Sequence, residues 1–277
     1  MTSTSTDHNT AISAEDDAML YKVEDHVATI TFNRPDQQNT ISGAMLHKFS
    51  ELLLTADHDV DVRAIIIIGT GKFFCAGLDL RGSDISKNLA DKKRRSPTTL
   101  DLRNTPPTVL HNIDTPTIAA LNGSAAGYGM DMALGCDIRI MADTAKLAAA
   151  FTARGIVPES GGTWILPRLI GWSKASEIIF TGKTLVAEEC KEMGLVSHVV
   201  NSNEVGARAL EMAKQIAAMA PLAVQSSKRM MRMSMNETFN DHVHHVFLQL
   251  LPLFQSDDFK EGMASFMEKR DADFKGQ

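Results

Sequence analysis

The sequence predicts an α/β fold in which parallel strands alternate with helices, followed by a C-terminal region made of helices alone. The segment from Val62 to Ile68 ends in a run of consecutive isoleucines. Because a run without polar alternation is typical of a strand covered on both faces, it indicates a parallel sheet. Strand and helix patterns succeed one another to about residue 200, as in βαβ units with right-handed crossovers.

The first strand is predicted over Val27 to Phe32, where β-branched residues predominate. The turn Asn33-Arg34-Pro35-Asp36 ends this strand. Ser42 is the predicted N-cap of the following helix, because apolar residues recur after it at helical spacing. These apolar residues are Met45, Leu46, Phe49, Leu52 and Leu53.

Two glycine-rich turns follow buried strands. The segment from Gly71 to Leu80 follows the isoleucine run, and the segment from Asn122 to Asp131 follows a strand predicted over residues 117–121. Small residues at such turns leave backbone N–H groups free to bind developing negative charge. Two of them converging on one carbonyl oxygen would form an oxyanion hole. Tight strand–helix packing explains either turn alone about as well.

The remaining chain completes the predicted organisation. A further strand is expected over Asp137 to Met141, and residues 83–113 form a polar, proline-containing insertion expected to lie over a site. C-terminal helices are expected from Asn203, Pro221, Asn236 and Ser256. We therefore predict three regions: a flexible N-terminal tail over 1–18, a core over 19–200 and a helical region over 201–277.

Composition excludes several classes of function. The 277 residues are 44% hydrophobic and 22% charged, with a net charge of −6, which gives a nucleic-acid role no electrostatic support. No apolar run reaches membrane-spanning length, and the polar, acidic N-terminal residues lack the pattern of a signal peptide. The three cysteines form no CxxC pair, and Cys75 is expected to be a buried packing residue. A cytoplasmic protein is the resulting expectation.

The ordered set of motifs resembles the enoyl-CoA hydratase/isomerase (crotonase) superfamily. The likeness runs from about Val27 to Lys275. It is carried by Asn33-Arg34-Pro35, Phe74-Cys75-Ala76-Gly77-Leu78-Asp79-Leu80, Asn122-Gly123 with Gly127-Tyr128-Gly129, Cys136-Asp137-Ile138-Arg139, Gly155-Ile156-Val157-Pro158 with Gly161-Gly162, and Phe259-Lys260-Glu261-Gly262 with Phe266-Met267-Glu268-Lys269-Arg270.

The resemblance implies a fold, an assembly and a substrate. The fold would be a crotonase-like spiral of βαβ units with a C-terminal helical trimerisation region, in a homotrimer or homohexamer. The substrate would be an acyl-CoA thioester whose carbonyl oxygen accepts hydrogen bonds from the backbone N–H groups of Leu78 and Tyr128. Substrate or CoA binding would involve Ala76, Gly77, Asp79, Leu80, Gly127, Phe151 and Lys269, with Lys269 approaching CoA phosphates across a subunit boundary.

The acid and base are assigned position by position from the same resemblance. Hydratases carry two glutamates, whose positions correspond here to Asp131 and Phe151. Because Phe151 cannot move a proton, simple hydratase chemistry is in doubt. Glu159 occupies a position where isomerase branches carry their working carboxylate, so Glu159 and Asp131 are the candidate catalytic residues. A helix-start role for Glu159 and a buried structural role for Asp131 remain open.

The leading interpretation is an acyl-CoA enzyme that forms and quenches a thioester enolate, by double-bond migration or by hydration. Hydrolysis or C–C cleavage of a CoA thioester or diketone, and an inactive acyl-CoA-binding oligomer, are the alternatives. No cofactor is expected beyond the CoA of the substrate. No metal site is expected either, because the helical spacing of His242, His244 and His245 does not place all three on one face. His111 is expected to be a packing or solvated residue.

Overall fold

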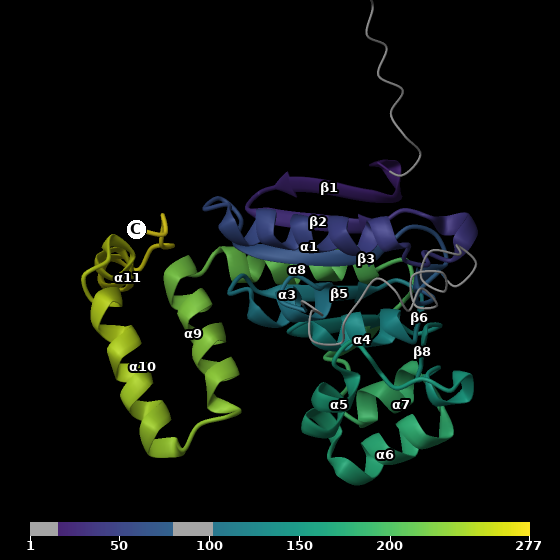
Figure 1. Cartoon of the computed structure of the whole chain (residues 1–277). Helices are drawn as coiled ribbons and strands as arrows, with labels where there is room; N and C mark the ends of the chain where they lie inside the picture. The colour runs from purple at the N-terminus through teal and green to yellow at the C-terminus, as the bar shows by residue number, and fades with distance from the viewer. Residues whose placement is uncertain (1–15, 80–101) are drawn as a thin grey trace, which may run out of the picture.

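The computed structural model describes residues 16–79 and 102–277. These residues form two sheets, helices that cover them, and a C-terminal group of helices that projects to one side (Figure 1). Residues 1–15 of the predicted tail, and 83–101 of the predicted insertion, lie outside the described residues. In the described residues, no helix is both long and apolar enough to cross a membrane.

The larger sheet confirms the predicted parallel core. Its strand order is β1-β2-β3-β5-β7-β10, and all neighbours are parallel except β1 and β2. The predicted strands appear as β2, β3, β5 and β7, whereas β1 and β10 were not predicted. The bounds are β1 Met19–Glu24, β2 Val27–Phe32, β3 Ala64–Gly69, β5 Thr117–Leu121, β7 Ile138–Ala142 and β10 His198–Val200.

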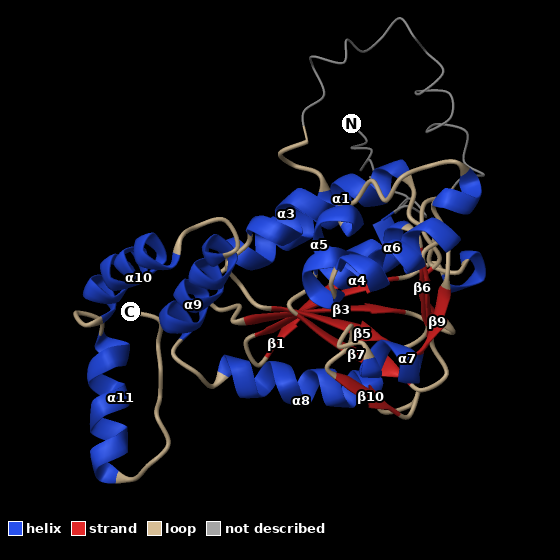
Figure 2. Cartoon of the chain, turned by 90° about the horizontal axis from the view of Figure 1, so that it is seen from below, coloured by secondary structure: helices blue, strands red, loops and turns tan. Residues whose placement is uncertain are grey.

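Helices cover both faces of this sheet, which explains why β5 is buried along its whole length. Helix α8 (Val205–Ala217) lies along one face, while α1 (Gly43–His58) and α3 (Pro106–Asn112) lie on the other (Figure 2). The predicted cap of α1 is confirmed, since Ser42 Oγ accepts a hydrogen bond from the Met45 N–H at 3.3 Å. The cap predicted at Asn203 was wrong by one residue, because the N-cap of α8 is Glu204.

A second, smaller sheet was not predicted. Its order is β4-β6-β8-β9, with β9 antiparallel to β8 and the others parallel. Its strands are β4 Phe73–Cys75, β6 Ser124–Ala126, β8 Lys146–Ala148 and β9 Thr184–Val186. Each of β3, β5 and β7 runs into the next strand of this sheet after a short turn, so the chain alternates between the sheets as a spiral.

Hydrogen bonds of the Asn122 side chain and a close backbone contact at Gly123 hold the two sheets together. The Gly69 N–H donates to Asn122 Oδ1 at 3.0 Å, and Asn122 Nδ2 donates to the Gly71 carbonyl at 3.0 Å. A Cβ at Gly123 would lie 2.0 Å from the Lys72 carbonyl oxygen. The crossing from β5 to β6 therefore needs glycine at position 123, and this close contact holds the first glycine turn against the second.

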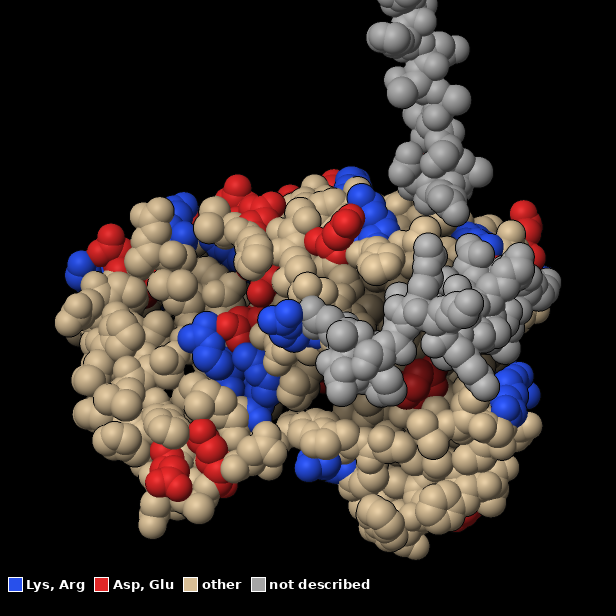
Figure 3. Space-filling model, in the orientation of Figure 1, with Lys and Arg blue, Asp and Glu red and all other residues tan. Residues whose placement is uncertain are grey.

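The C-terminal helices α9 (Pro221–Ser234), α10 (Phe239–Leu253) and α11 (Asp257–Glu268) stand away from the sheets (Figure 1). The predicted starts at Pro221 and Ser256 are confirmed by a proline in the first turn and by a Ser256 cap on the Phe259 N–H. The start predicted at Asn236 was wrong, because Thr238 caps α10 instead. On the face shown in Figure 3, α10 is mostly uncharged, whereas Lys and Arg gather over α9.

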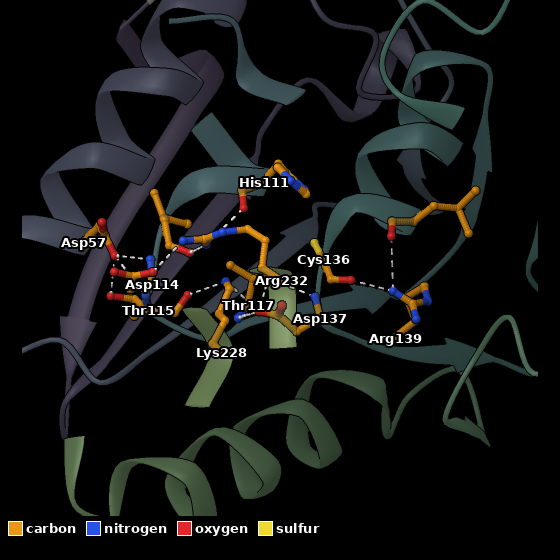
Figure 4. A network of polar contacts seen from close by, with 12 residues as sticks. Asp57, His111, Asp114, Thr115, Thr117, Cys136, Asp137, Arg139, Lys228 and Arg232 are labelled. Carbon is orange, nitrogen blue, oxygen red and sulfur yellow. Dashed lines mark hydrogen bonds and ion pairs between the residues drawn. The ribbon is translucent and has the colours of Figure 1, made fainter. Parts of the chain in front are cut away.

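A network of ion pairs attaches α9 to the sheet domain (Figure 4). The Asp114 carboxylate accepts hydrogen bonds from Arg229 Nε at 2.9 Å and from Arg232 Nη2 at 2.8 Å. Lys228 Nζ donates to the Thr115 carbonyl at 2.9 Å and lies 2.8 Å from the Asp137 carboxylate. Two consecutive turns of α9 are thus held on the segment that leads into β5 and on Asp137, which directly precedes β7.

Replacing Asp114 with alanine is expected to destabilise the protein by about 2 kcal/mol, because two guanidinium groups lose their carboxylate. Burial alone would raise the pKa of Asp114, but the Arg229 and Arg232 hydrogen bonds outweigh it and lower that pKa. This pairing therefore stabilises the fold above the ordinary pKa of 3.8 and is lost as the pH falls through the lower folded value. Urea unfolding at pH 7 and pH 3 measures both effects.

The control for Asp114→Ala is Glu24→Ala, which removes the exposed pair between Lys22 and Glu24. An exposed pair contributes less than about 1 kcal/mol, so the control should unfold close to wild type. Equal stability losses in the two variants would show that the α9 network does not hold the helices in place.

Candidate active site

The two predicted glycine turns meet because their strands are neighbours in the small sheet. Strands β4 and β6 are parallel, with Phe73 opposite Ser124 and Cys75 opposite Ala125, so both end at the same edge. A Cβ at Gly77 would lie 3.0 Å from the Ala126 carbonyl oxygen and 3.8 Å from the Tyr128 nitrogen. The backbones of the two turns are therefore in direct contact.

The two candidate oxyanion donors are the backbone N–H groups of Leu78 and Tyr128, one in each turn. Ile41 N–H donates to the Gly77 carbonyl at 2.9 Å, and the Asp79 N–H donates to the Ile41 carbonyl at 2.9 Å. Because groups alternate in extended backbone, the N–H of Leu78 faces the opposite side. The N–H of Tyr128 belongs to the first residue of α4 (Tyr128–Gly135), which has no acceptor within the helix.

Neither of these two N–H groups has an acceptor within residues 16–79 and 102–277. The helix dipole of α4 adds positive potential at the Tyr128 N–H. Two backbone donors at the edge of one sheet are the kind of groups that can bind an anionic oxygen, and neither of them requires a particular side chain.

A cavity of about 210 Å³ opens beside these donors. Its described lining includes most of the predicted binding residues: Ala76, Gly77, Leu78, Asp79, Gly127, Tyr128, Phe151 and Glu159. It also includes Thr40, Ala150, Arg154 and Ile156, which the sequence analysis did not identify. Ile156 belongs to the recognised Gly155-Ile156-Val157-Pro158 motif, and the other three lie near recognised positions, so nearness in sequence was the signal that could have indicated them. Leu80 lies outside the described residues.

Glu159 is one of the carboxylates in the described lining of the cavity. It lines the cavity from the loop between a short 3₁₀ turn, Thr152–Arg154, and helix α5 (Gly162–Ile170). Partial burial raises the pKa of Glu159, which brings the carboxyl group closer to the range useful for proton transfer near neutral pH. Phe151, 2% exposed, forms an apolar part of the same wall.

The Tyr128 side chain is an unsuitable base. Burial raises the pKa of its phenol far above the ordinary value of 10.0, and the nearby charge of Glu159 adds to this effect. The phenol therefore stays neutral at physiological pH. Tyr128 can contribute its backbone N–H and apolar ring surface to the cavity.

Asp131 does not belong to the described lining of the cavity. It is 2% exposed and lies in the first turn of α4, where Oδ2 accepts hydrogen bonds from Ser160 Oγ at 3.0 Å and from the Gly162 N–H at 3.2 Å. Burial raises the pKa of Asp131 to about 7, although both hydrogen bonds oppose the shift. The buried structural role, left open by the sequence, thus has direct geometric support, and a catalytic role stays a prediction.

Asp79 supports the first turn as well as lining the cavity. Arg34 Nη2 lies 3.0 Å from Asp79 Oδ2, and both side chains are largely buried. The Arg34 N–H donates to Asn39 Oδ1 at 2.8 Å, and Asn39 Nδ2 donates to the Phe73 and Thr70 carbonyls. Asn39, fully buried, was missed by the sequence analysis although it follows the recognised Asn33-Arg34-Pro35 turn.

Lys269 is not brought to the cavity within one chain. It ends α11, in the C-terminal group of helices, on the opposite side of the molecule from β6 and β8 (Figure 1). The predicted approach of Lys269 to CoA phosphates required a second subunit, so it stays a prediction.

The remaining candidates are packing residues. His111 packs edge-on against Trp164, with ring centroids 5.3 Å apart, which confirms its predicted packing role. Cys75 is fully buried, and burial raises the pKa of its thiol to about 12, so it is a packing residue as predicted and not a nucleophile. His242 and His245 both contact Glu237.

A spiral that alternates between two sheets, with two glycine turns meeting beside a cavity, defines the crotonase fold. A solved structure of an enoyl-CoA hydratase from Bacillus anthracis matches it with a TM-score of 0.85 and 32% identity, covering 94% of this chain and 100% of that chain. A model of the enoyl-CoA hydratase/isomerase family matches residues 22–277. The chain belongs to the enoyl-CoA hydratase/isomerase family.

Two Escherichia coli (strain K12) relatives are similar to the chain over almost its whole length. One, named 2,3-dehydroadipyl-CoA hydratase, is 32% identical over 259 residues, which are 94% of this chain and 99% of the relative. The other, named 1,2-epoxyphenylacetyl-CoA isomerase, is 31% identical over 264 residues, which are 94% of this chain and 98% of the relative. One of these two relatives is thus named as a hydratase and the other as an isomerase, at nearly the same identity to this chain.

Proposed function

We propose that the protein is an acyl-CoA enzyme that shifts a double bond in an unsaturated acyl-CoA through a thioester enolate. Glu159 removes a proton from the carbon next to the thioester, the C–H electron pair forms a new C=C bond to the carbonyl carbon, and the carbonyl π pair moves onto the oxygen. The N–H groups of Leu78 and Tyr128 bind that oxygen, each stabilising the charge by on the order of 3 kcal/mol. The protonated Glu159 then returns the proton to the carbon at the far end of the dienolate.

The main support for this proposal comes from the carboxylates that line the cavity. Of the two carboxylates in the described lining, Asp79 is paired with Arg34, whereas Glu159 has a raised pKa and faces the cavity. Phe151 stands where a hydratase needs its second carboxylate. One carboxylate can both remove and return a proton, but activating water while protonating carbon is ordinarily the work of two. This favours isomerisation over hydration.

Thermal unfolding and turnover test the proposal together. Acetoacetyl-CoA should raise the melting temperature in proportion to its excess over the dissociation constant, and free CoA should raise it less because it lacks the thioester oxygen. A 3-enoyl-CoA should be converted to its 2-enoyl isomer. In deuterated water, an isomerase can return the abstracted proton and show incomplete solvent exchange, whereas a hydratase must incorporate solvent oxygen.

Other outcomes would select another chemistry. Hydration of crotonyl-CoA faster than isomerisation would support a hydratase, and release of free CoA would support a hydrolase. Binding of acyl-CoA without turnover would support an inactive binding protein. Absence of any thermal shift with CoA thioesters at millimolar concentration would contradict the acyl-CoA site itself.

The C-terminal helices are proposed to form a homotrimer, or a homohexamer made from two trimers. Large apolar side chains on α10 and α11 are exposed, including Phe239 at 79% and Phe266 at 77%. A surface of this kind is typical of a protein–protein contact. The same contact would give Lys269 the second subunit that its predicted approach to CoA requires.

The double variant Phe239→Glu with Phe266→Glu is expected to sediment as a smaller species, because charges placed in an apolar contact lose their hydration. Analytical ultracentrifugation at micromolar concentration measures the change. Val60→Glu is the control, since Val60 is 90% exposed but lies in the connection between α1 and β3. A wild-type protein that sediments as a monomer would contradict the proposed assembly.

A further inference from the structure

One buried carboxylate connects the two parts of the candidate site. Asp131 is on α4, three residues after Tyr128, whose N–H begins that helix. Its side chain accepts hydrogen bonds from Ser160 and Gly162, the residues that follow Glu159 at the start of α5. Asp131 therefore links the helix that carries one oxyanion donor to the loop that carries the proposed base.

The contact is close and leaves little freedom to the Glu159 loop. Ser160 is 1% exposed, and its hydroxyl reaches the Asp131 carboxylate at 3.0 Å. A Cβ at Gly162 would lie 2.3 Å from Asp131 Oδ1, so only glycine allows the loop backbone to approach the carboxylate this closely. This close approach explains why glycine is needed at position 162, the second residue of the Gly161-Gly162 pair that contributed to the resemblance.

The same contact is poorly arranged for proton transfer by Asp131. Its Oδ2 is already an acceptor for two donors, and the residue is absent from the described lining of the cavity. A group that exchanges protons with substrate must come within hydrogen-bond reach of it, directly or through one water. Glu159, next to Ser160 in the chain, meets that requirement through its place in the lining.

We propose that Asp131 is a positioning residue, which fixes Glu159 relative to the Tyr128 N–H by holding Ser160 and Gly162. The inference rests on the proposed function, in which Glu159 moves the proton and Tyr128 binds the oxygen. A displacement of about 1 Å between reacting groups can lower a rate about 100-fold. A buried link between α4 and the loop is therefore sufficient to influence turnover without contacting substrate.

Three variants separate positioning from proton transfer. Asp131→Asn keeps an acceptor oxygen for Ser160 and Gly162 but cannot act as a base, whereas Asp131→Leu removes both. If Asp131 positions Glu159, Asp131→Leu lowers kcat by about 100-fold while KM changes less than about threefold. The kcat of Asp131→Asn should then be at least about tenfold higher than that of Asp131→Leu. The acidic limb of the kcat/KM profile persists in Asp131→Asn because Glu159 still titrates.

Ser160→Ala keeps the test decisive if Asp131→Leu does not fold. It removes one donor to the carboxylate and is expected to lower kcat about fivefold to tenfold without raising KM. The matched control is Ser50→Ala, a buried serine of α1 whose hydroxyl has no partner in the described part of the chain. Equal activity of Ser160→Ala and the control would contradict the positioning role.

Amide hydrogen exchange gives a readout that does not depend on activity. Residues 158–162 should exchange faster in Ser160→Ala and Asp131→Leu than in wild type or Asp131→Asn. Unchanged exchange in every variant would overturn the positioning role even in an active enzyme. If Asp131→Asn is as slow as Asp131→Leu and loses the acidic limb, Asp131 is a proton carrier. A wild type that converts no acyl-CoA would contradict the proposed function, while the exchange data would still test the link.

Discussion

Replacing Glu159 with glutamine is expected to lower turnover of the true substrate by at least about 100-fold, the lower range for loss of a positioned acid/base. Glutamine has almost the same size but cannot accept or return a proton. Acyl-CoA affinity should stay nearly unchanged, because the backbone donors of Leu78 and Tyr128 and the lining of the cavity remain in place. A loss in kcat without a rise in the dissociation constant is the expected signature.

Steady-state kinetics with an enoyl-CoA, and calorimetric binding of acetoacetyl-CoA, measure these two quantities. Because burial raises the pKa of Glu159, the carboxylate form is lost as the pH falls through a value above the ordinary 4.5. The acidic limb of the wild-type kcat/KM profile should therefore lie above pH 4.5. Glu177→Gln, on the exposed surface of α6 (Trp172–Thr181), is the control. A near wild-type rate for Glu159→Gln would reduce Glu159 to a helix-start residue.

Replacing Gly77 with alanine is expected to lower kcat by about 100-fold or more, comparable with the loss of one oxyanion donor. Gly77 has a φ of +105°, which an L-residue rarely adopts, and its Cβ would meet the Ala126 carbonyl oxygen at 3.0 Å. The chain must rotate or shift to accept the methyl group. Since Leu78 is the next residue, its N–H would turn away from the Tyr128 N–H.

The experiment compares kcat and thermal stability in Gly77→Ala and Gly194→Ala. Gly194 also has a positive φ, +77°, but a Cβ there would meet nothing within 4 Å, and the residue lies outside the cavity lining. Both variants should lose stability through backbone strain, whereas only Gly77→Ala should lose turnover in the protein that remains folded. A folded Gly77→Ala enzyme with wild-type kcat would remove Leu78 from the proposed oxyanion hole.

Local pattern was sufficient to predict the four central strands of the larger sheet, β2, β3, β5 and β7. Strand β2 was predicted with its observed bounds, and β3 followed from a run of isoleucines. The small sheet was missed because its strands have three residues each, too few to show a period. Those short strands are nevertheless what brings the two glycine turns together.

The candidate site shows the same division between local and tertiary information. The residues of the two turns could be identified because glycine there answers a local backbone requirement. The burial of Asp131 could not be predicted from the sequence. A carboxylate in the first turn of a helix gives the same sequence pattern whether it faces solvent, substrate or a neighbouring loop. Thr40 and Arg154 reach the cavity from segments far apart in sequence, and Lys269 depends on a contact that a single chain does not contain.

In the proposed oxyanion hole, main-chain donors at Leu78 and Tyr128 leave the side chains at those two positions independent of charge stabilisation. Under this proposal, Leu78, which lines the cavity and is only partly buried, can be exchanged for other apolar residues to reshape the pocket, whereas Tyr128 packs in the core. Glu159 lies on a separate loop, outside both glycine turns. Under this proposal, substitutions at residue 78 would change the preference for the acyl group, and substitutions at residue 159 would change the reaction. A library of variants at residue 78 therefore need not include residue 159.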